Sequence, residues 1–303
     1  MNASHYPTIR IRAENGYLLI REGLSLTFHI RRSHKDISQS IGHSLEAYLR
    51  ATGANVLGLY ADEEGYWQSL DEAGWAVIRG ELNNSMNAYI SLADASGTEQ
   101  RFRFIYQGRR LEDPFLKNQP GATSAVSFWL PTEYLEEHGP GRVRELAMEL
   151  ASLLPFCTGN TGLSFHCDTG LVGVQGAVGK LRFRYPGMDV PNMSWLSLHI
   201  GTQVRGPSWL TFLGQPVLGE LGGVSGLRAQ LHHPETTVQE LEGARAVVTL
   251  GPWPEAGDTE QGRFLPAYRE LARVLEPWLY HEPRRHPSQS MEDTRRWERR
   301  FLD

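Results

Sequence analysis

Cysteine is scarce in this chain, since Cys157 and Cys167 are the only two in 303 residues. A framework of several disulfides is therefore excluded, and a reducing compartment is the simpler expectation. No apolar run approaches the roughly 20 residues of a membrane-spanning helix. The first twenty residues, MNASHYPTIRIRAENGYLLI, lack a basic segment followed by an apolar stretch and a cleavage site, as a signal peptide would have. We therefore expect a cytoplasmic protein that does not bind a membrane.

Excess charge is also missing, because the formal net charge is only −5. Sequence-independent binding of nucleic acid requires dense neutralisation of phosphates by Lys and Arg, so we expect no nucleic-acid partner. Hydrophobic residues make up 40% and charged residues 21% of the chain, which is typical of a folded protein rather than a disordered one. Nothing in the composition indicates an oligomeric state.

Strand and helix patterns both occur, without the regular alternation of a doubly wound sheet. TIRIRA, YLLIR and LSLTFHI are predicted to be three antiparallel strands, with Asn15–Gly16 suited to the first hairpin turn. Apolar residues at helical spacing predict helices around 37–49, 143–154 and 264–275. The predicted class is therefore α+β, with largely antiparallel sheets and packed helices.

The chain is predicted to divide at residue 155. Residues 1–155 and 156–280 form two α+β halves, and residues 281–303 form a tail packed on the body, with Trp297 and Phe301 as its apolar anchors. RFRF at 101–104 and RFRY at 182–185 share a pattern, and each half ends in a helix. The two halves are therefore hypothesised to be similar, although two short matches do not establish a repeat.

The segments that most resemble cofactor and metal sites lack the residue spacing that such sites require. GVQGAVGKL has the glycines and lysine of a phosphate loop, but the spacing is wrong and Leu181 replaces the Ser or Thr that would hold magnesium, so we interpret it as a Gly-rich strand or turn. The pairs His29 with His34 and His232 with His233 lack the spacing of a zinc site. We predict no cofactor and no metal.

A nucleophile is not evident either. His166, Cys167 and Asp168 are adjacent, which would place alternate side chains on opposite faces of a strand. We predict no catalytic residue. The alternative left open is an uncharacterised hydrolase or transferase whose cleft is assembled from distant residues, such as His166, Cys167 or the acidic stretch between Tyr60 and Trp75.

An acidic, aromatic stretch between Tyr60 and Trp75 is the strongest local feature. Five carboxylates so close together would repel one another if all were buried, so exposure is expected. One interpretation is a solvated surface with Trp67 and Trp75 packed into the core. The other is an interface for a basic protein, such as a nuclease, with aromatic anchors and acidic steering. The predicted contact residues here are Asp62, Glu63, Glu64, Tyr66, Trp67, Asp71 and Glu72.

Two further acidic loops are candidates for the same role. PWPEAGDTEQG contributes Glu255, Asp258 and Glu260 to the predicted partner-binding residues. TEYLEEHG is a third candidate, with Glu133, Glu136 and Glu137. Contacts that select one partner are expected on such variable loops.

The sequence resembles the type VI secretion immunity proteins, a family formerly catalogued as a domain of unknown function. The segments that carry the resemblance are HIRRSHKD, GLYADEEGYWQSLDEAGWAVIRGEL, SWLTFLGQPVLGELGGVSGLRAQL, LPAYRELARVLEP and RRWERRF. The resemblance implies an α+β protein that binds and neutralises a cognate toxin effector, expected to be a nuclease, by occluding its active cleft or its access to substrate, without catalysis. It assigns no toxin-contacting position. A structural component of the secretion machinery remains a further alternative.

Overall fold

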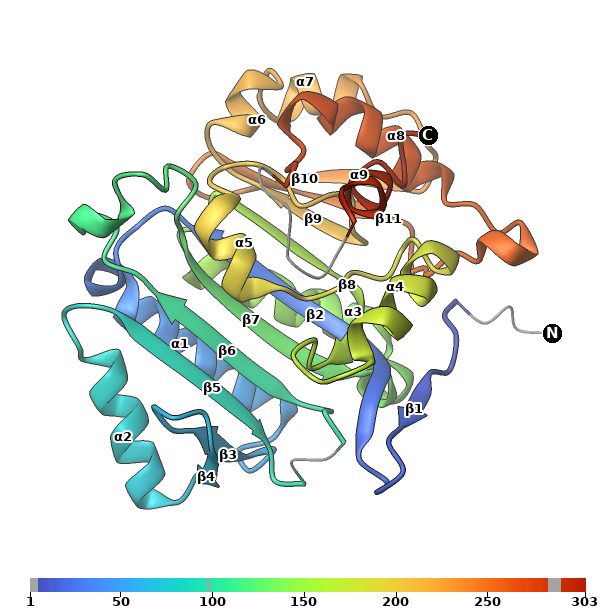
Figure 1. Ribbon diagram of the computed structural model, residues 1–303. Coiled ribbons are helices and arrows are strands. Elements are labelled where there is room, and N and C mark those ends of the chain that lie inside the picture. The colour runs from blue at the N-terminus through green and yellow to red at the C-terminus, as the bar shows by residue number, and fades with distance from the viewer. Residues whose placement is uncertain (1–4, 97–98, 283–289) are drawn as a thin grey trace.

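One sheet runs through the molecule in the computed structural model, which describes residues 5–96, 99–282 and 290–303 (Figure 1). The strands of this described part are β1 Arg10–Arg12, β2 Leu18–Ile30, β3 Leu57–Ala61, β4 Trp67–Ser69, β5 Ala88–Asp94, β6 Arg103–Gly108, β7 Ser124–Pro131, β8 Thr158–Cys167, β9 Leu210–Leu213, β10 Thr236–Leu241 and β11 Arg245–Leu250. Their order is β10-β11-β9-β8-β2-β7-β6-β5-β3-β4, with β1 on β2. All these pairings are antiparallel, so the predicted α+β class is confirmed.

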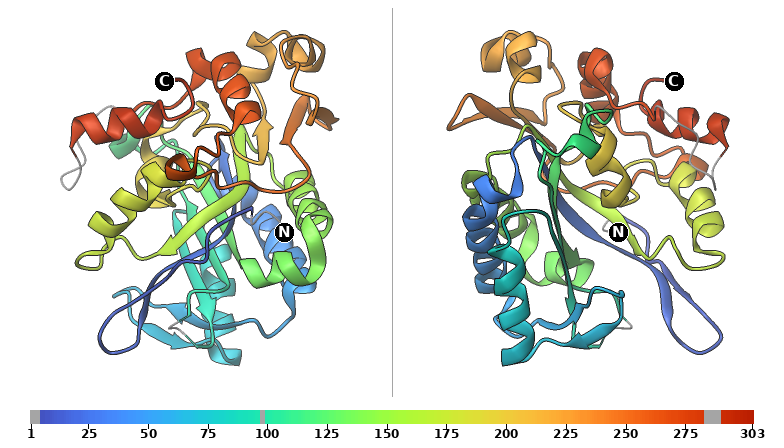
Figure 2. Two further views of the ribbon diagram at one scale, coloured as in Figure 1. Left: turned by 90° about the vertical axis from the view of Figure 1, so that its right-hand side faces the viewer. Right: turned by 60° about the vertical axis from the view of Figure 1, so that its left-hand side comes forward.

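Helices cover the two faces of the sheet differently. The α-helices of the described part are α1 His34–Thr52, α2 Glu72–Leu82, α3 Thr132–Leu153, α4 Val174–Arg184, α5 Met193–His199, α6 Val217–Glu220, α7 Gly223–Ala229, α8 Pro266–Leu275 and α9 Met291–Glu298. Helices α1, α2 and α3 pack on one face, whereas α4 and α5 lie on the other (Figures 1 and 2). Helices α6, α7 and α8 pack against β9 and β11 in a second apolar cluster.

The central strand β2 explains why the two faces differ. Leu24, Leu26 and Phe28 point into the main apolar core, where none of the three is accessible to solvent. The residue that follows each of them, Ser25, Thr27 or His29, lies on the opposite face because side chains alternate along a strand. The sheet therefore has an apolar face under α1 and α3 and a polar face toward α4 and α5.

The prediction of separate strands YLLIR and LSLTFHI was wrong, because β2 continues without a break through Gly23. Gly23 is required for packing and not for a turn. A Cβ atom at this position would lie 2.2 Å from the His166 ring of β8, so only glycine lets that ring lie against the strand. The turn predicted at Asn15–Gly16 is confirmed, since Gly16 has φ +86° and its N–H donates to the Ala13 carbonyl.

GVQGAVGKL was also misinterpreted, since most of it lies in helix α4. Val174 and Val178 are buried at helical spacing, and this apolar stripe outweighs the low helix propensity of the glycines. Gly173, with φ +83°, directly precedes the helix. No phosphate loop is formed.

The predicted boundary at residue 155 falls in the connection between α3 and β8. Strand β2 pairs with β7 on one side of that boundary in sequence and with β8 on the other. In the tail, residues 283–289 lie outside the described residues, while Trp297 and Phe301 are buried. The division into two similar halves stays a prediction.

Candidate functional site

The turn between β3 and β4 holds the acidic residues of the opening stretch in a fixed arrangement. The Asp62 carboxylate accepts hydrogen bonds from the Tyr66 N–H at 2.8 Å and from Gln68 Nε2 at 2.7 Å. These hydrogen bonds, that of Gln68 foremost, lower the pKa of Asp62. Glu63 and Glu64 are exposed, and their carboxylates form no hydrogen bond or ion pair with any described residue. The turn thus presents two carboxylates to solvent.

The acids that follow belong to the start of helix α2. Asp71 caps it, because its carboxylate accepts the Gly74 N–H at 3.0 Å. Glu72 is the first residue of the helix and is exposed, where its charge favours the helix dipole. Asp71 therefore has a structural role in addition to any contact with a partner.

The aromatic residues of the stretch divide between surface and core. Tyr66 is 71% exposed and Trp67 is 40% exposed, whereas Trp75 is partly buried against the main core. The expectation that Trp67 packs into the core was wrong. Strand β4 is the edge of the sheet, and the Trp67 side chain lies across Arg103 of β6, with the guanidinium carbon 5.5 Å from the ring centroid. An aromatic surface therefore adjoins the acidic turn.

The second acidic loop lies far from this turn, because it follows β11 near the opposite end of the sheet (Figure 1). Asp258 is only 1% exposed, and its carboxylate accepts hydrogen bonds from Arg184 and caps the short 3-10 helix Thr259–Gln261. Glu260 is exposed and pairs with Arg184 at 2.7 Å, and Glu255 contacts the His5 ring. The structure does not bring the two acidic segments together. Asp258 is buried and stabilises the conformation of its own loop.

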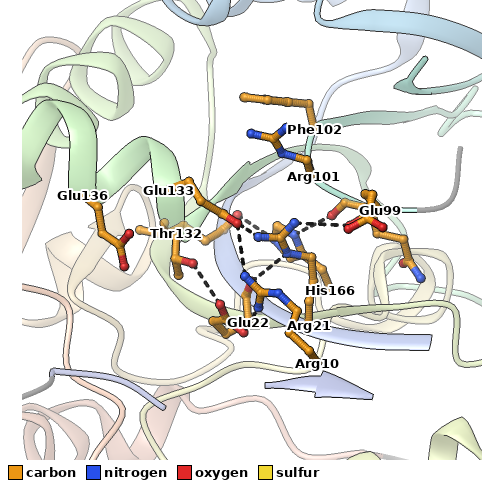
Figure 3. Close-up of polar contacts among 12 residues, drawn as sticks. Arg10, Arg21, Glu22, Glu99, Arg101, Phe102, Thr132, Glu133, Glu136 and His166 are labelled. Carbon is orange, nitrogen blue, oxygen red and sulfur yellow. Dashed lines mark hydrogen bonds and ion pairs between the residues drawn. The ribbon is translucent and has the colours of Figure 1, made fainter. Parts of the chain in front are cut away.

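The third acidic loop is part of an ion network at the start of α3 (Figure 3). Arg21 of β2 is 1% exposed, and its Nη2 lies 2.5 Å from Glu133 Oε2. Arg10 pairs with both Glu22 and Glu133, and Thr132 donates its hydroxyl to Glu22 at 3.0 Å. This network joins the hairpin of β1 and β2 to α3.

Two residues of the same candidate loop lie outside this network. Glu136 accepts a hydrogen bond from the Tyr6 hydroxyl at 3.0 Å, and Glu137 is exposed. Glu133 therefore serves the fold, whereas Glu136 and Glu137 are exposed, and Glu137 lies 4.0 Å from His138.

His166 and Cys167 do not form a catalytic pair. Burial lowers the pKa of His166 to about 3, and its two ring nitrogens contact the carbonyls of Leu24 and Gln100. Burial raises the pKa of Cys167 to about 12, so its thiol stays protonated and is a poor nucleophile. Among the described residues no group of three or more His, Cys, Asp or Glu side chains is placed to hold a metal ion.

A polar cavity of about 250 Å³ on the polar face of the sheet was not anticipated. Its walls include His29 of β2, Trp129 of β7 and Arg103 of β6. Both ring nitrogens of His29 and the Trp129 Nε1 are buried without a hydrogen-bond partner among the described residues. The alternation of LSLTFHI gives this strand one polar face, which was the available signal, but alternation does not show that the polar face is buried.

Comparisons with known proteins agree with the resemblance drawn from the sequence. A solved structure described as Pseudomonas aeruginosa T6SS protein PA0821 is similar, with a TM-score of 0.80 and 19% identity over 96% of this chain and 87% of that chain. No curated protein matches the sequence. In the described part of the chain, no helix is both long enough and apolar enough to cross a membrane. The family model TsiV, described as "Type VI immunity for VRR-NUC", matches residues 40–301. The chain therefore belongs to this family of type VI immunity proteins for VRR-NUC nuclease effectors.

Proposed function

We propose that the protein neutralises its cognate VRR-NUC effector by direct binding that covers the active cleft of the nuclease or its route for nucleic acid. The observation that carries this proposal is the turn with Glu63 and Glu64. Its two carboxylates are exposed, have no cationic partner among the described residues and adjoin the exposed side chains of Tyr66 and Trp67. A surface that must meet nucleic acid carries cationic groups for the phosphates, so it is complementary in charge to this turn.

We expect the aromatic residues of this surface to contribute most of its binding energy. Trp and Tyr bury a large area with few rotatable bonds, and they are enriched among residues that dominate binding energy. The carboxylates mainly accelerate association and discriminate against other partners. A stable complex also requires at least roughly 1,000 Å² of buried surface, which extends well beyond one turn.

The mechanism that we propose has no chemical step. Inhibition by occlusion is stoichiometric and is reversed when the complex dissociates. The geometry of His166 and Cys167 gives no support to catalysis, since a buried neutral ring and a protonated thiol do not activate a nucleophile. Because the effector acts on nucleic acid, the compartment we propose is the cytoplasm, and the protein itself binds neither nucleic acid nor a membrane.

The test is to express a candidate VRR-NUC effector with and without the protein, and to measure survival and binding of the purified pair. Occlusion predicts that nuclease activity falls in proportion to the molar ratio, reaches its minimum near one to one, and returns when the proteins are separated. An unrelated nuclease serves as the control. Lasting inactivation at a small fraction of the effector concentration would contradict occlusion and favour an enzyme. Failure to bind or protect would contradict the proposed function altogether.

A further inference from the structure

Part of the polar face of the sheet is open to solvent. Helices α1 and α2 lie behind β5 and β6, while α4 and α5 cover the neighbouring strands of the front face (Figures 1 and 2). Tyr89 of β5 is accordingly 51% exposed, and it lines the polar cavity together with Arg103, whose guanidinium lies over the exposed Trp67. Tyr89, Arg103 and Ile105 of the sheet line the polar cavity, as do Asp168 and Thr169, which directly follow β8.

Arg103 lies at the centre of this open face between two tryptophans. Its guanidinium carbon lies 5.5 Å from the ring centroid of Trp67 and 5.2 Å from that of Trp129. Its polar contacts are few. Nη2 donates to Ser91 Oγ at 3.4 Å, and Nε is buried without a hydrogen-bond partner among residues 5–96, 99–282 and 290–303.

The charge of Arg103 is also poorly neutralised. No carboxylate of the described residues lies within 4.0 Å of its guanidinium, in contrast to Arg21, which pairs with Glu133. Burial lowers the pKa of Arg103, because the loss of water around its cation outweighs the opposing effect of nearby groups such as Tyr89 and Asp168. A partly desolvated cation of this kind is unfavourable until an anion reaches it.

The cavity beside Arg103 offers further hydrogen-bond donors. Trp129 and His29 are both buried, and neither the Trp129 Nε1–H nor the two His29 ring nitrogens have a hydrogen-bond partner in the part of the chain that the structure describes. Burial lowers the pKa of His29 to about 3, so the ring is neutral. Two acids also line the cavity. Asp189 contacts Arg205 at 3.5 Å, and Asp168 lies farther than pairing distance from Arg103. These acids disfavour a multiply charged phosphate more than a single carboxylate.

We propose that Arg103 and Trp129 bind a carboxylate that the cognate nuclease presents, an Asp or Glu side chain on a docked loop, with Trp67 and Tyr89 packing around that loop. This inference rests on the proposed function. A planar guanidinium binds a carboxylate with two parallel hydrogen bonds, and Trp, Tyr and Arg are the residues that most often anchor protein interfaces. The exposed Trp67 and Tyr89 favour a protein as the occupant, because a docked loop can pack against both rings and a free anion cannot.

The two ends of this surface then recognise opposite charges. Glu63 and Glu64 face cationic groups of the nuclease, while Arg103 receives an acidic one. A surface that needs a cationic group at one end and an anionic group at the other fixes the orientation of a complex, because a rotated or unrelated partner would place like charges together. A basic groove alone would leave Arg103 without an anionic partner.

The test compares Arg103→Met and Arg103→Lys with Arg101→Met, a matched change at an exposed arginine two residues away. We expect Arg103→Met to weaken binding of the purified cognate effector at least tenfold, Arg103→Lys to weaken it less, and Arg101→Met to change it less than twofold. The free Arg103→Met protein should melt at the same temperature as wild type or higher, because an unpaired cation has been removed. A purely structural arginine would show the opposite shift without a selective effect on binding.

The outcomes separate this inference from the proposed function. If wild type binds the effector and Arg103→Met binds it equally well, the carboxylate site is wrong while immunity by binding stands. If Arg103→Met melts at a lower temperature than wild type, the Arg103→Lys variant becomes the test. The inference is overturned if Arg103→Lys binds the effector with the same affinity as wild type. If inorganic phosphate binds wild type but not Arg103→Met, and the effector binds both equally, the site takes free anions and the inference is likewise overturned. If wild type does not bind the effector, the proposed function itself fails.

Discussion

The Arg21 guanidinium lies 2.5 Å from the Glu133 carboxylate, so a fully buried cation of β2 is neutralised by a partly exposed residue at the start of α3. Burial lowers the pKa of Arg21, and the charges of Glu133 and Glu22 oppose that effect. The contact joins segments that are 112 residues apart in the sequence. It therefore ties the central strand β2 to a helix on the apolar face of the sheet.

Replacing Glu133 by Gln should destabilise the fold more than an ordinary surface substitution. The change leaves Arg21 buried with only its weaker partners, at a cost of about 1–3 kcal/mol. Adding Arg21→Met should recover part of that loss, because the unpaired cation is then absent. Urea unfolding of the two single variants and the double variant measures this coupling. If the two effects simply add, the ion pair is not a stabilising contact.

Acidification should destabilise the protein through His29 and His166. Burial lowers the pKa of each to about 3, against an ordinary value of 6.5, so between these values the unfolded chain binds protons that the folded protein does not. Stability is therefore complete above pH 6.5 and falls as the pH drops toward 3. From pH 7.5 to pH 5 the loss should be about 2 kcal/mol for each histidine.

Unfolding in urea at the two pH values measures this loss. His29→Gln should flatten the pH dependence, whereas His43→Gln, at an exposed position, should leave it unchanged. An unaltered slope in His29→Gln would show that His29 is protonated in the folded protein.

Asp71 should contribute to stability as a helix cap. Asp71→Ala removes the acceptor of the Gly74 N–H and should cost about 1 kcal/mol. Glu72→Ala, at the next position and without a capping contact, should cost less than about 0.5 kcal/mol. Thermal and urea unfolding of both variants test the distinction. Equal losses would mean that charge near the helix start matters and the cap does not.

The parts of the fold that could be predicted are those with local causes. The alternation of LSLTFHI identified most of β2, and the helical spacing of Ile37, Ile41 and Leu45 identified α1. The predictions of a strand break at Gly23 and of a strand or turn in GVQGAVGKL were wrong, because contacts between residues distant in sequence determine the local structure there. Gly23 looks like a break but makes room for His166, and the glycines of α4 are held in a helix by buried valines.

The candidate site shows the same limit more strongly. Glu63 and Glu64 were predictable because consecutive acids are expected to be exposed. The proposed role of Arg103 could not be predicted from the sequence. It depends on contacts with Trp67 and Trp129 of other strands and on the absence of a nearby carboxylate among the described residues. Strand register alone brings these three residues together, and no local pattern encodes it.

Reversing the charge of the acidic turn should weaken the complex with the nuclease. In Glu63→Lys/Glu64→Lys, cationic side chains would face the cationic groups of the effector, and we expect affinity to fall at least tenfold at low salt, mostly through slower association. Glu240→Lys/Glu242→Lys makes the same change in net charge at exposed positions at the opposite end of the sheet, on and beside β10. This control should bind almost as wild type does.

Salt gives an independent measure of the same contact, because the Debye length shortens from about 30 Å at 0.01 M to about 8 Å at 0.15 M. Association of wild type should slow as salt rises, and association of the Glu63→Lys/Glu64→Lys variant should slow less or become faster. Stopped-flow association rates at several salt concentrations supply the comparison. Equal affinity and equal salt dependence in the two charge-reversed proteins would remove the acidic turn from the interface. The tryptophan and arginine surface would then remain as the contact to examine.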